Sequence, residues 1–297
     1  MSTAQTAARG NGWRVLAAAP AMIGSLLLLV FLTGGLGRWG PLFVLAWLGI
    51  GLLILTRFGE AAAARLLCRF RRPAPAEAAR VSPVLLAVLE RCGLNRGAVD
   101  LYVVRGNDRN AWATGKRSIA LTAGLMTDHA RGTISDRTLG SIVCHEVGHI
   151  VTRSVRLAPM TTWFALPWRS THRLVARLVL PIAARQPRLP LALVVITAFT
   201  AAIGQGFHKH QWGSVAVLVS IAISVLAAPA IDAAASRAGE YEADQFAAQA
   251  GYGDDLSRAL TQIDPATGTL SLRSRALSRH PGTTRRVTRL HLDLRKP

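Results

Sequence analysis

Residues 144–149 read Cys-His-Glu-Val-Gly-His, inside an apolar run from Leu139 to Val151 that is typical of a buried helix. On a helix, positions i and i+4 share a face, so His145 and His149 are predicted to stand side by side. Glu146 follows the first of them. Two imidazoles and a carboxylate at this spacing form the H-E-x-x-H pattern of hydrolytic zinc sites. A chance match of five residues is the alternative, and further motifs downstream weaken it.

A third metal ligand is predicted in residues 237–244, which read Arg-Ala-Gly-Glu-Tyr-Glu-Ala-Asp. Hydrolytic zinc needs one more protein ligand and keeps a fourth position for water. Glu240 and Asp244 share a helix face, whereas Glu242 points about 200° away from Glu240. We therefore expect Glu240 to bind the metal and Asp244 to orient a ligand histidine through its ring N–H. A solvated acidic face is the alternative, although the whole chain has only 16 acidic residues.

The local pattern around these motifs predicts an alternation of short strands and helices. Residues 83–92 are expected to form a helix, and residues 99–104, 110–114 and 118–122 short strands. Ser135 is expected to cap the motif helix. Short helices are expected at residues 256–263 and 270–277. Strands followed by the metal-binding helix are the order of a zincin-type domain.

Together, these motifs resemble the HtpX family of membrane zinc metalloproteases, which are relatives of the CAAX prenyl proteases. Residues 110–115, Asn-Ala-Trp-Ala-Thr-Gly, resemble the family's N-A-F-A-T-G strand, with Trp112 in place of Phe. Residues 280–286, His-Pro-Gly-Thr-Thr-Arg-Arg, resemble its late H-P-x-x-x-x-R segment. The resemblance covers most of the chain, from the first hydrophobic segment to about Leu290.

The resemblance implies an α+β fold of the zincin (gluzincin) type, mainly helical, with one zinc per chain. His280 would be a catalytic donor to the developing oxyanion, with Arg286 nearby. The alternative for His280 is a turn cap before Pro281. An edge strand would pair with the substrate backbone, and its residues are Asn110, Ala111, Trp112 and Ala113. Trp112 would line a substrate pocket or be an ordinary packed aromatic.

The composition favours a membrane protein. Hydrophobic residues make up 51% of the 297 residues, and the mean hydropathy is +0.30. The formal net charge is +19. No nucleic-acid-binding motif accompanies this charge, so we expect anionic lipid headgroups as the partner, and no nucleic acid. The three cysteines, Cys68, Cys92 and Cys144, lack C-x-x-C spacing, which predicts reduced thiols in a reducing compartment.

Two hydrophobic hairpins are predicted to supply about four transmembrane helices. Charge-free segments run over Val15–Gly37 and Gly40–Thr56, and again over Leu189–Phe207 and Gln211–Ile231. Each segment of the first pair, at about 17–23 residues, is long enough to cross a bilayer as a helix. A cleaved signal peptide is the alternative for the first segment, but a second span follows it at once.

Arginines flank the first hairpin unevenly, which predicts its orientation. Those before it are Arg9 and Arg14, those after it are Arg57, Arg65, Arg69, Arg71 and Arg72, and Arg38 lies in its loop. The positive-inside rule then places both ends, and the zinc domain, in the cytoplasm. The chain is expected to be a multi-pass protein of the cell (inner or plasma) membrane.

These predictions divide the chain into seven segments. They are an N-terminal tail (1–14), a transmembrane hairpin (15–57), a basic linker (58–80), a zincin half with the H-E-x-x-H helix (81–156), a basic amphipathic membrane-surface segment (157–188), a second transmembrane hairpin (189–231) and a zincin half with the glutamate-ligand helix and the C-terminal tail (232–297). Arg169, Arg173 and Arg177 recur at four-residue spacing in the surface segment. A plain solvated helix face is the alternative there.

The predicted function is that of an integral-membrane zinc endopeptidase. It would act on protein or peptide substrates, and misfolded or membrane proteins at the cytoplasmic face fit protein quality control. Glu146 would accept the proton of the attacking water and pass it to the leaving amine. Two alternatives stay open: a non-catalytic basic membrane scaffold with a structural or vestigial zinc site, and a prenyl-protein (CAAX-type) endoprotease. The sequence leaves the physiological substrate and the oligomeric state open.

Overall fold

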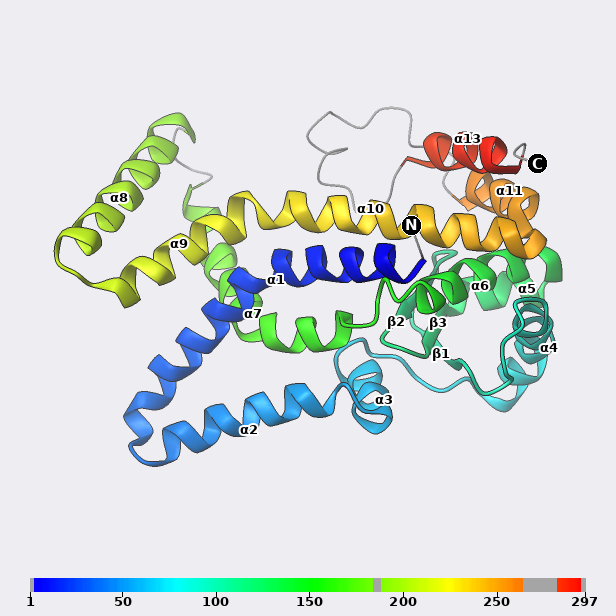
Figure 1. Cartoon of the computed structure of the whole chain (residues 1–297), viewed down its shortest axis with the longest axis horizontal. Helices are drawn as coiled ribbons and strands as arrows, with labels where there is room; N and C mark the ends of the chain where they lie inside the picture. Colours follow the sequence, from blue (N-terminus) through cyan, green and yellow to red (C-terminus); the bar gives the residue numbers. More distant parts are fainter. Residues whose placement is uncertain (1–2, 184–187, 264–281, 295–297) are drawn as a thin grey trace. The chain divides into compact units, whose positions relative to one another are not determined.

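The computed structural model describes residues 3–183, 188–263 and 282–294, which form helices and one small sheet (Figure 1). The chain divides into two compact units. The first comprises Met1–Arg14, Leu53–Pro159 and Asp232–Pro297, and the second comprises Val15–Leu52 and Met160–Ile231. The predicted α+β class, mainly helical with a small sheet, is confirmed.

The sheet of the first unit has three strands: β1 (Asp100–Val104), β2 (Ala111–Thr114) and β3 (Ser118–Thr122). Their order is β1-β3-β2, with β3 parallel to β1 and antiparallel to β2. Every residue of β3 is buried, as expected of a central strand. The strands predicted from the sequence are therefore confirmed, and β2 lies at one edge of this sheet.

The motif helix α6 (Asp136–Val151) runs through the core of the first unit. The hydroxyl of Ser135 accepts a hydrogen bond from the backbone N–H of Thr138, so the predicted cap is confirmed. All residues from Leu139 to His149 are buried. Helices α4 (Pro75–Arg91) and α11 (Gly253–Ile263) pack on α6 together with β2. A helix buried on all sides holds its side chains in fixed positions, which a metal site requires.

Helix α4 begins at Pro75, eight residues before the predicted start at residue 83. The carboxylate of Glu77 accepts the backbone N–H of Ala74 at 2.7 Å and pairs with Arg71 at 2.6 Å. This bond satisfies an N–H group at the helix start, and Pro75 tolerates the first helical position. Pro83 consequently lies inside the helix. The prediction was wrong because the capping carboxylate, not the second proline, sets the boundary.

The glutamate-ligand helix α10 (Ala228–Ala247) passes close to α6. A Cβ atom on Gly148 would lie 3.0 Å from the Cα of Ala243, so the two backbones approach about as closely as glycine and alanine allow. Helix α10 ends in a short π-helical turn (Ala248–Tyr252), where Gly251 has φ 79°. The left-handed conformation favours glycine and ends the helix there.

Three further helices lie in the first unit among the residues that the structure describes. They are α3 (Arg57–Leu66), α5 (Ala123–Ala130) and α13 (Thr283–Leu294). Helix α13 packs beside α11 (Figure 1). The helix predicted at residues 256–263 is confirmed as part of α11, and the one predicted at residues 270–277 lies outside the described residues.

Long helices make up most of the second unit. They are α1 (Thr3–Thr33), continued by a short 3-10 turn (Gly34–Leu36), α2 (Trp39–Leu53), α7 (Ala158–Ala183), α8 (Arg188–His208) and α9 (Trp212–Leu226); the first residues of α1 and α7 belong to the first unit. The indole of Trp163 donates to the backbone oxygen of Trp47 at 3.0 Å. Phe164 packs edge-on against the Trp47 ring, 5.1 Å between centroids. These contacts hold α7 against α2.

One helical segment in the described part of the chain, Gly12–Leu36, is long and apolar enough to cross a membrane by itself. Two bent pairs of helices would each add a span if the pair counts as one: Trp39–Leu53 with Arg57–Leu66, and Trp212–Ile223 with Ala228–Gln262. Length and composition therefore support one to three spans among the described residues. The predicted count of about four stays a prediction.

Candidate metal centre

Helix α6 brings His145, Glu146 and His149 together as the sequence predicted. Each offers one potential ligand atom, and these atoms lie within 4.8 Å of one another. The two imidazole rings stand edge to face, 4.8 Å between centroids. All three side chains are buried. Buried, convergent donors of this kind form a metal site if a further ligand completes the set.

Glu240 of α10, the residue predicted as the further ligand, lies beside this cluster. One carboxylate oxygen lies 3.5 Å from Nε2 of His145, and the other lies 3.6 Å from Nε2 of His149. Donors bound at about 2.0–2.2 Å to a tetrahedral zinc are separated by about 3.3–3.6 Å. Each of these two Glu240–histidine distances is within the range expected for a pair of ligands on one tetrahedral ion. The close approach of Gly148 and Ala243 makes this spacing possible.

The charges around this cluster also favour a divalent cation. Glu146, Glu240 and Asp244 are buried carboxylates, and Arg286 is a buried guanidinium. With both histidines neutral, as metal binding requires, three negative charges against one positive charge leave a formal charge of −2 on this cluster. Burying such a charge without compensation is costly, whereas one divalent ion neutralises it. The nitrogen and carboxylate donors suit zinc.

Asp244 and Arg286 form a buried network beneath the His145 ring. The carboxylate of Asp244 lies 3.0 Å from Nδ1 of His145, which leaves Nε2 for the metal. Arg286 binds the same carboxylate with two nitrogens, at 2.8 and 2.6 Å, and reaches Glu240 at 3.2 Å. Arg286 thus links Asp244, which lies against His145, to Glu240, the predicted metal ligand.

Ser154 plays the corresponding part for His149, and no sequence motif points to it. Its hydroxyl lies 2.9 Å from Nδ1 of His149 and donates to the backbone oxygen of the same residue at 3.3 Å. A hydroxyl that donates to the carbonyl is free to accept the Nδ1–H, so Nε2 carries the lone pair for the metal. Arg153, with φ 59°, turns the chain back after α6 to place this serine.

The surroundings of His145 and Asp244 shift their pKa values toward the charged forms. Burial alone would lower the pKa of His145, but hydrogen bonds to Asp244 and Glu240 raise it to about 10 in the metal-free chain. Burial would raise the pKa of Asp244, but hydrogen bonds from His145 and Arg286 hold it below its usual value. A metal ion must therefore displace a proton from His145 when it binds.

The remaining predicted residues lie in three different settings. Glu242 is partly exposed, and burial raises the pKa of its carboxyl group. Trp112 packs on the cluster formed by Ala64, Phe70, Tyr102 and Ala120. The side chain of Asn110 accepts the backbone N–H of Ala111 at 2.9 Å. His280 lies outside the described residues.

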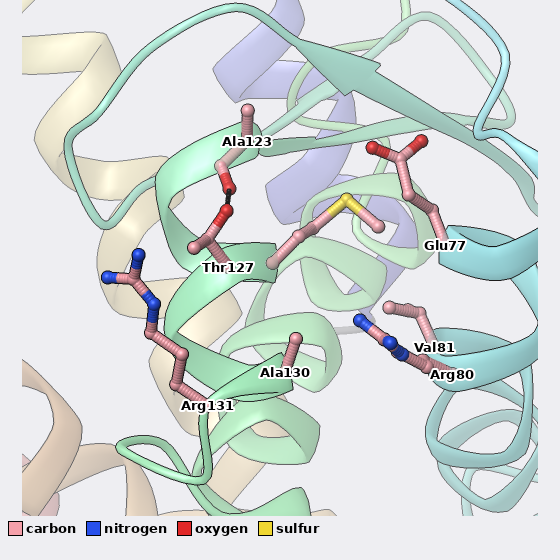
Figure 2. A pocket seen from close by; sticks show the side chains of 8 residues that line it. Glu77, Arg80, Val81, Ala123, Thr127, Ala130 and Arg131 are labelled. Carbon is pink, nitrogen blue, oxygen red and sulfur yellow. Dashed lines mark hydrogen bonds between the residues drawn. The ribbon is translucent and has the colours of Figure 1, made fainter.

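A cavity of about 420 Å³ lies between α4 and α5, and none of the predicted site residues lines it. Figure 2 shows Glu77, Arg80 and Val81 of α4 on one side and Thr127 and Ala130 of α5 on the other. The hydroxyl of Thr127 is turned back onto its own helix, bonded to the backbone oxygen of Ala123 at 2.8 Å. None of the residues that line this cavity belongs to the histidine cluster, so the cavity is separate from the candidate metal centre.

The fold and the buried His-Glu-His cluster define a metallopeptidase of the zincin type. Residues 75–292 match Peptidase family M48, and the chain belongs to this family. It is 23% identical to "Protease HtpX homolog" from Pelotomaculum thermopropionicum over 94% of this chain and 96% of that protein. The predicted kinship with HtpX-like proteases is confirmed.

The solved structure of S. mikatae Ste24p is also similar. It has 18% sequence identity and a TM-score of 0.48, with 94% of this chain covered. This chain spans only 65% of the length of that protein.

Proposed function

We propose that this protein is an integral-membrane zinc endopeptidase that cleaves misfolded or membrane proteins at the cytoplasmic face. The observation that supports it most is the spacing of Glu240 from both Nε2 atoms, 3.5 and 3.6 Å, beside the buried carboxylate of Glu146. A purely structural zinc site would not need that additional carboxylate. Membership of a peptidase family adds to this support.

His145, His149 and Glu240 would hold the metal, and Asp244, Ser154 and Arg286 would keep these ligands in place. Bound zinc supplies Lewis acidity toward a water molecule and a peptide carbonyl. Glu146 accepts the proton of the attacking water and delivers it to the leaving amine. One carboxylate oxygen of Glu146 lies within 4.8 Å of the ligand nitrogens of both histidines, and this distance leaves room for a water molecule.

Strand β2 would bind the substrate as an added strand. It has one partner strand, β3, within the described part of the chain, and it lies against α6. Main-chain pairing of this kind accepts many sequences, which suits a protease acting on misfolded chains. His280 remains a candidate donor to the developing oxyanion on the strength of the family resemblance alone.

Metal removal tests the proposed function. The purified full-length protein in detergent is expected to contain about one zinc per chain and to cleave an unfolded casein-like substrate. A zinc chelator should abolish cleavage, and stoichiometric zinc should restore it, because the histidine pair alone cannot activate water. Zinc content is measured by mass spectrometry and cleavage by fluorescence. Undiminished cleavage by the metal-free protein would exclude a zinc-dependent mechanism.

Topology is the second expectation under this proposal. Arginines on both sides of the first hairpin predict that the termini and the zinc domain face the cytoplasm of the cell membrane. A reporter that is active only in the cytoplasm, fused after Pro297, should be active, and one fused at Arg38 should be silent. An extracytoplasmic reading at Pro297 would overturn the topology, and with it the prediction of reduced cysteines.

A further inference from the structure

Glu60 is a buried carboxylate in α3 that belongs neither to the candidate metal centre nor to its supporting network. Its side chain is 4% exposed. It accepts hydrogen bonds from the backbone N–H groups of Lys116 and Arg117, at 2.9 and 3.0 Å, and from the hydroxyl of Ser118 at 3.0 Å. An ionised carboxylate only accepts hydrogen bonds, so it suits a turn that presents three donors.

The turn between β2 and β3 is built to admit this carboxylate. Gly115 has φ 70°, and a Cβ atom there would lie 2.4 Å from the carboxyl carbon of Glu60. The ammonium group of Lys116 adds a bond of 2.6 Å to the backbone oxygen of Leu55, just before α3. Both the conformation and the space at position 115 therefore require glycine.

The same turn is attached to the loop that orients His149. The backbone N–H of Gly115 donates to the backbone oxygen of Val155 at 3.1 Å. Val155 directly follows Ser154, whose hydroxyl lies 2.9 Å from Nδ1 of His149. The β2–β3 turn is thus fixed to α3 on one side and to the end of the motif helix on the other.

The pairing register shows which backbone groups of β2 are directed toward the open edge. Thr122 donates its backbone N–H to the oxygen of Asn110 at 3.0 Å, so Asn110 faces β3. Bonding alternates along an antiparallel pair, so Trp112 also faces β3, whereas Ala111 and Ala113 face away. The backbone N–H of Ala111 is already bonded to the side-chain oxygen of Asn110, so it is not available to an incoming strand. The oxygen of Ala111 and both backbone groups of Ala113 are directed toward an incoming strand.

We propose that Glu60 is a positioning residue: by fixing the β2–β3 turn, it aligns β2 for main-chain pairing with a peptide substrate beside the metal centre. The proposal rests on the proposed function, because it assigns β2 to substrate binding. The bonds of Glu60 are to the turn and not to the residues of the candidate metal centre, so its role is positioning and not catalytic. Its effect passes through residues 115–118 to the strand that precedes them and to the loop that holds His149.

A peptide-binding assay tests this role in full-length protein carrying Glu146→Gln, which prevents turnover. A fluorescent extended peptide is titrated into the parent and into the variant that also carries Glu60→Gln. Glutamine presents an N–H₂ group to one of the turn's N–H donors, so the turn should loosen. Peptide affinity should fall about 10-fold, because a misaligned strand loses one or two of its main-chain hydrogen bonds to the peptide. Deuterium exchange over residues 111–118 should rise, and zinc content should persist.

Asp255→Asn in the same background is the matched control. Asp255 is also 4% exposed and is bound by Arg137 and Arg258 at 2.5 and 2.6 Å. This control should lower the unfolding temperature and leave peptide affinity and exchange over residues 111–118 unchanged. A Glu60→Gln variant that binds peptide as tightly as its parent overturns the proposal.

Two further outcomes are also decisive. If Glu60→Gln does not fold, Ser118→Ala removes one of the three bonds and is judged by the same criterion. If the Glu146→Gln parent binds no peptide, the assignment of β2 to substrate binding fails. Deuterium exchange over residues 111–118 then still shows whether Glu60 fixes the turn, so the two failures are distinguishable.

Discussion

Glu146→Gln is expected to lower proteolysis by about 10²–10⁴-fold while the protein keeps one zinc per chain. Glutamine has nearly the same shape as glutamate but cannot accept the proton of the attacking water. The ligands His145, His149 and Glu240 are unchanged by this substitution, so metal content should not fall. Steady-state cleavage and zinc content are measured on the same purified samples.

The matched control for this substitution is Glu90→Gln, which makes the same chemical change at an exposed position of α4. Exposed changes of this kind usually alter stability by less than about 0.5 kcal/mol, so cleavage should stay at the wild-type rate. Loss of zinc from Glu146→Gln would show that Glu146 is a metal ligand, and it would contradict its role as the proton acceptor. Full activity in Glu146→Gln would favour a site without general-base catalysis.

The sequence predicted the candidate site where the determinants are local. The i, i+4 spacing placed His145 and His149 on one face, and the same rule separated Glu240 and Asp244 from Glu242. The structure indeed buries Glu240 and Asp244, at 5% and 3% exposure, and leaves Glu242 partly exposed. Helical periodicity is a short-range property, so a pattern of a few residues is enough to predict it.

The sequence could not predict contacts that depend on the path of the chain between elements. Ser154 follows a helix end, and only the left-handed conformation of Arg153 turns it toward His149. Glu60 is 56 to 58 residues from the groups it binds. No spacing rule connects residues at such separations. For Ser154 the sequence carried one chemical signal, which is that each ligand histidine needs an acceptor for its second ring nitrogen. No such signal existed for Glu60.

The three neighbouring acids of α10 should differ sharply when each is replaced by alanine. Glu240→Ala removes the donor that lies 3.5 and 3.6 Å from the two histidines, so zinc should be lost and cleavage abolished. Asp244→Ala leaves the ligands but frees the His145 ring to turn, so zinc affinity or activity should fall about 10–100-fold. Glu242→Ala should change little and serves as the internal control.

The structure adds a second consequence for Asp244→Ala. Arg286 is 7% exposed and binds Asp244 through two nitrogens, at 2.8 and 2.6 Å. Removing one partner of a buried ion pair costs about 3–5 kcal/mol, because a charge is left buried without its counterpart. The unfolding temperature of Asp244→Ala should therefore fall as well, whereas Glu242→Ala should unfold as the wild type does.

Zinc content, cleavage and unfolding temperature together identify the role of each acid. When metal-free samples are compared, loss of zinc binding with the smaller loss of stability marks a ligand, as expected for Glu240→Ala, because Arg286 keeps its two bonds to Asp244 there. Weakened zinc binding with a large loss of stability marks the residue that supports both His145 and Arg286. If Glu242→Ala loses as much zinc as Glu240→Ala, the metal is held from the other face of α10. The assignment of Glu240 as the third ligand would then be wrong, and the 3.5 and 3.6 Å spacing would reflect ion pairing with the histidines in the metal-free chain.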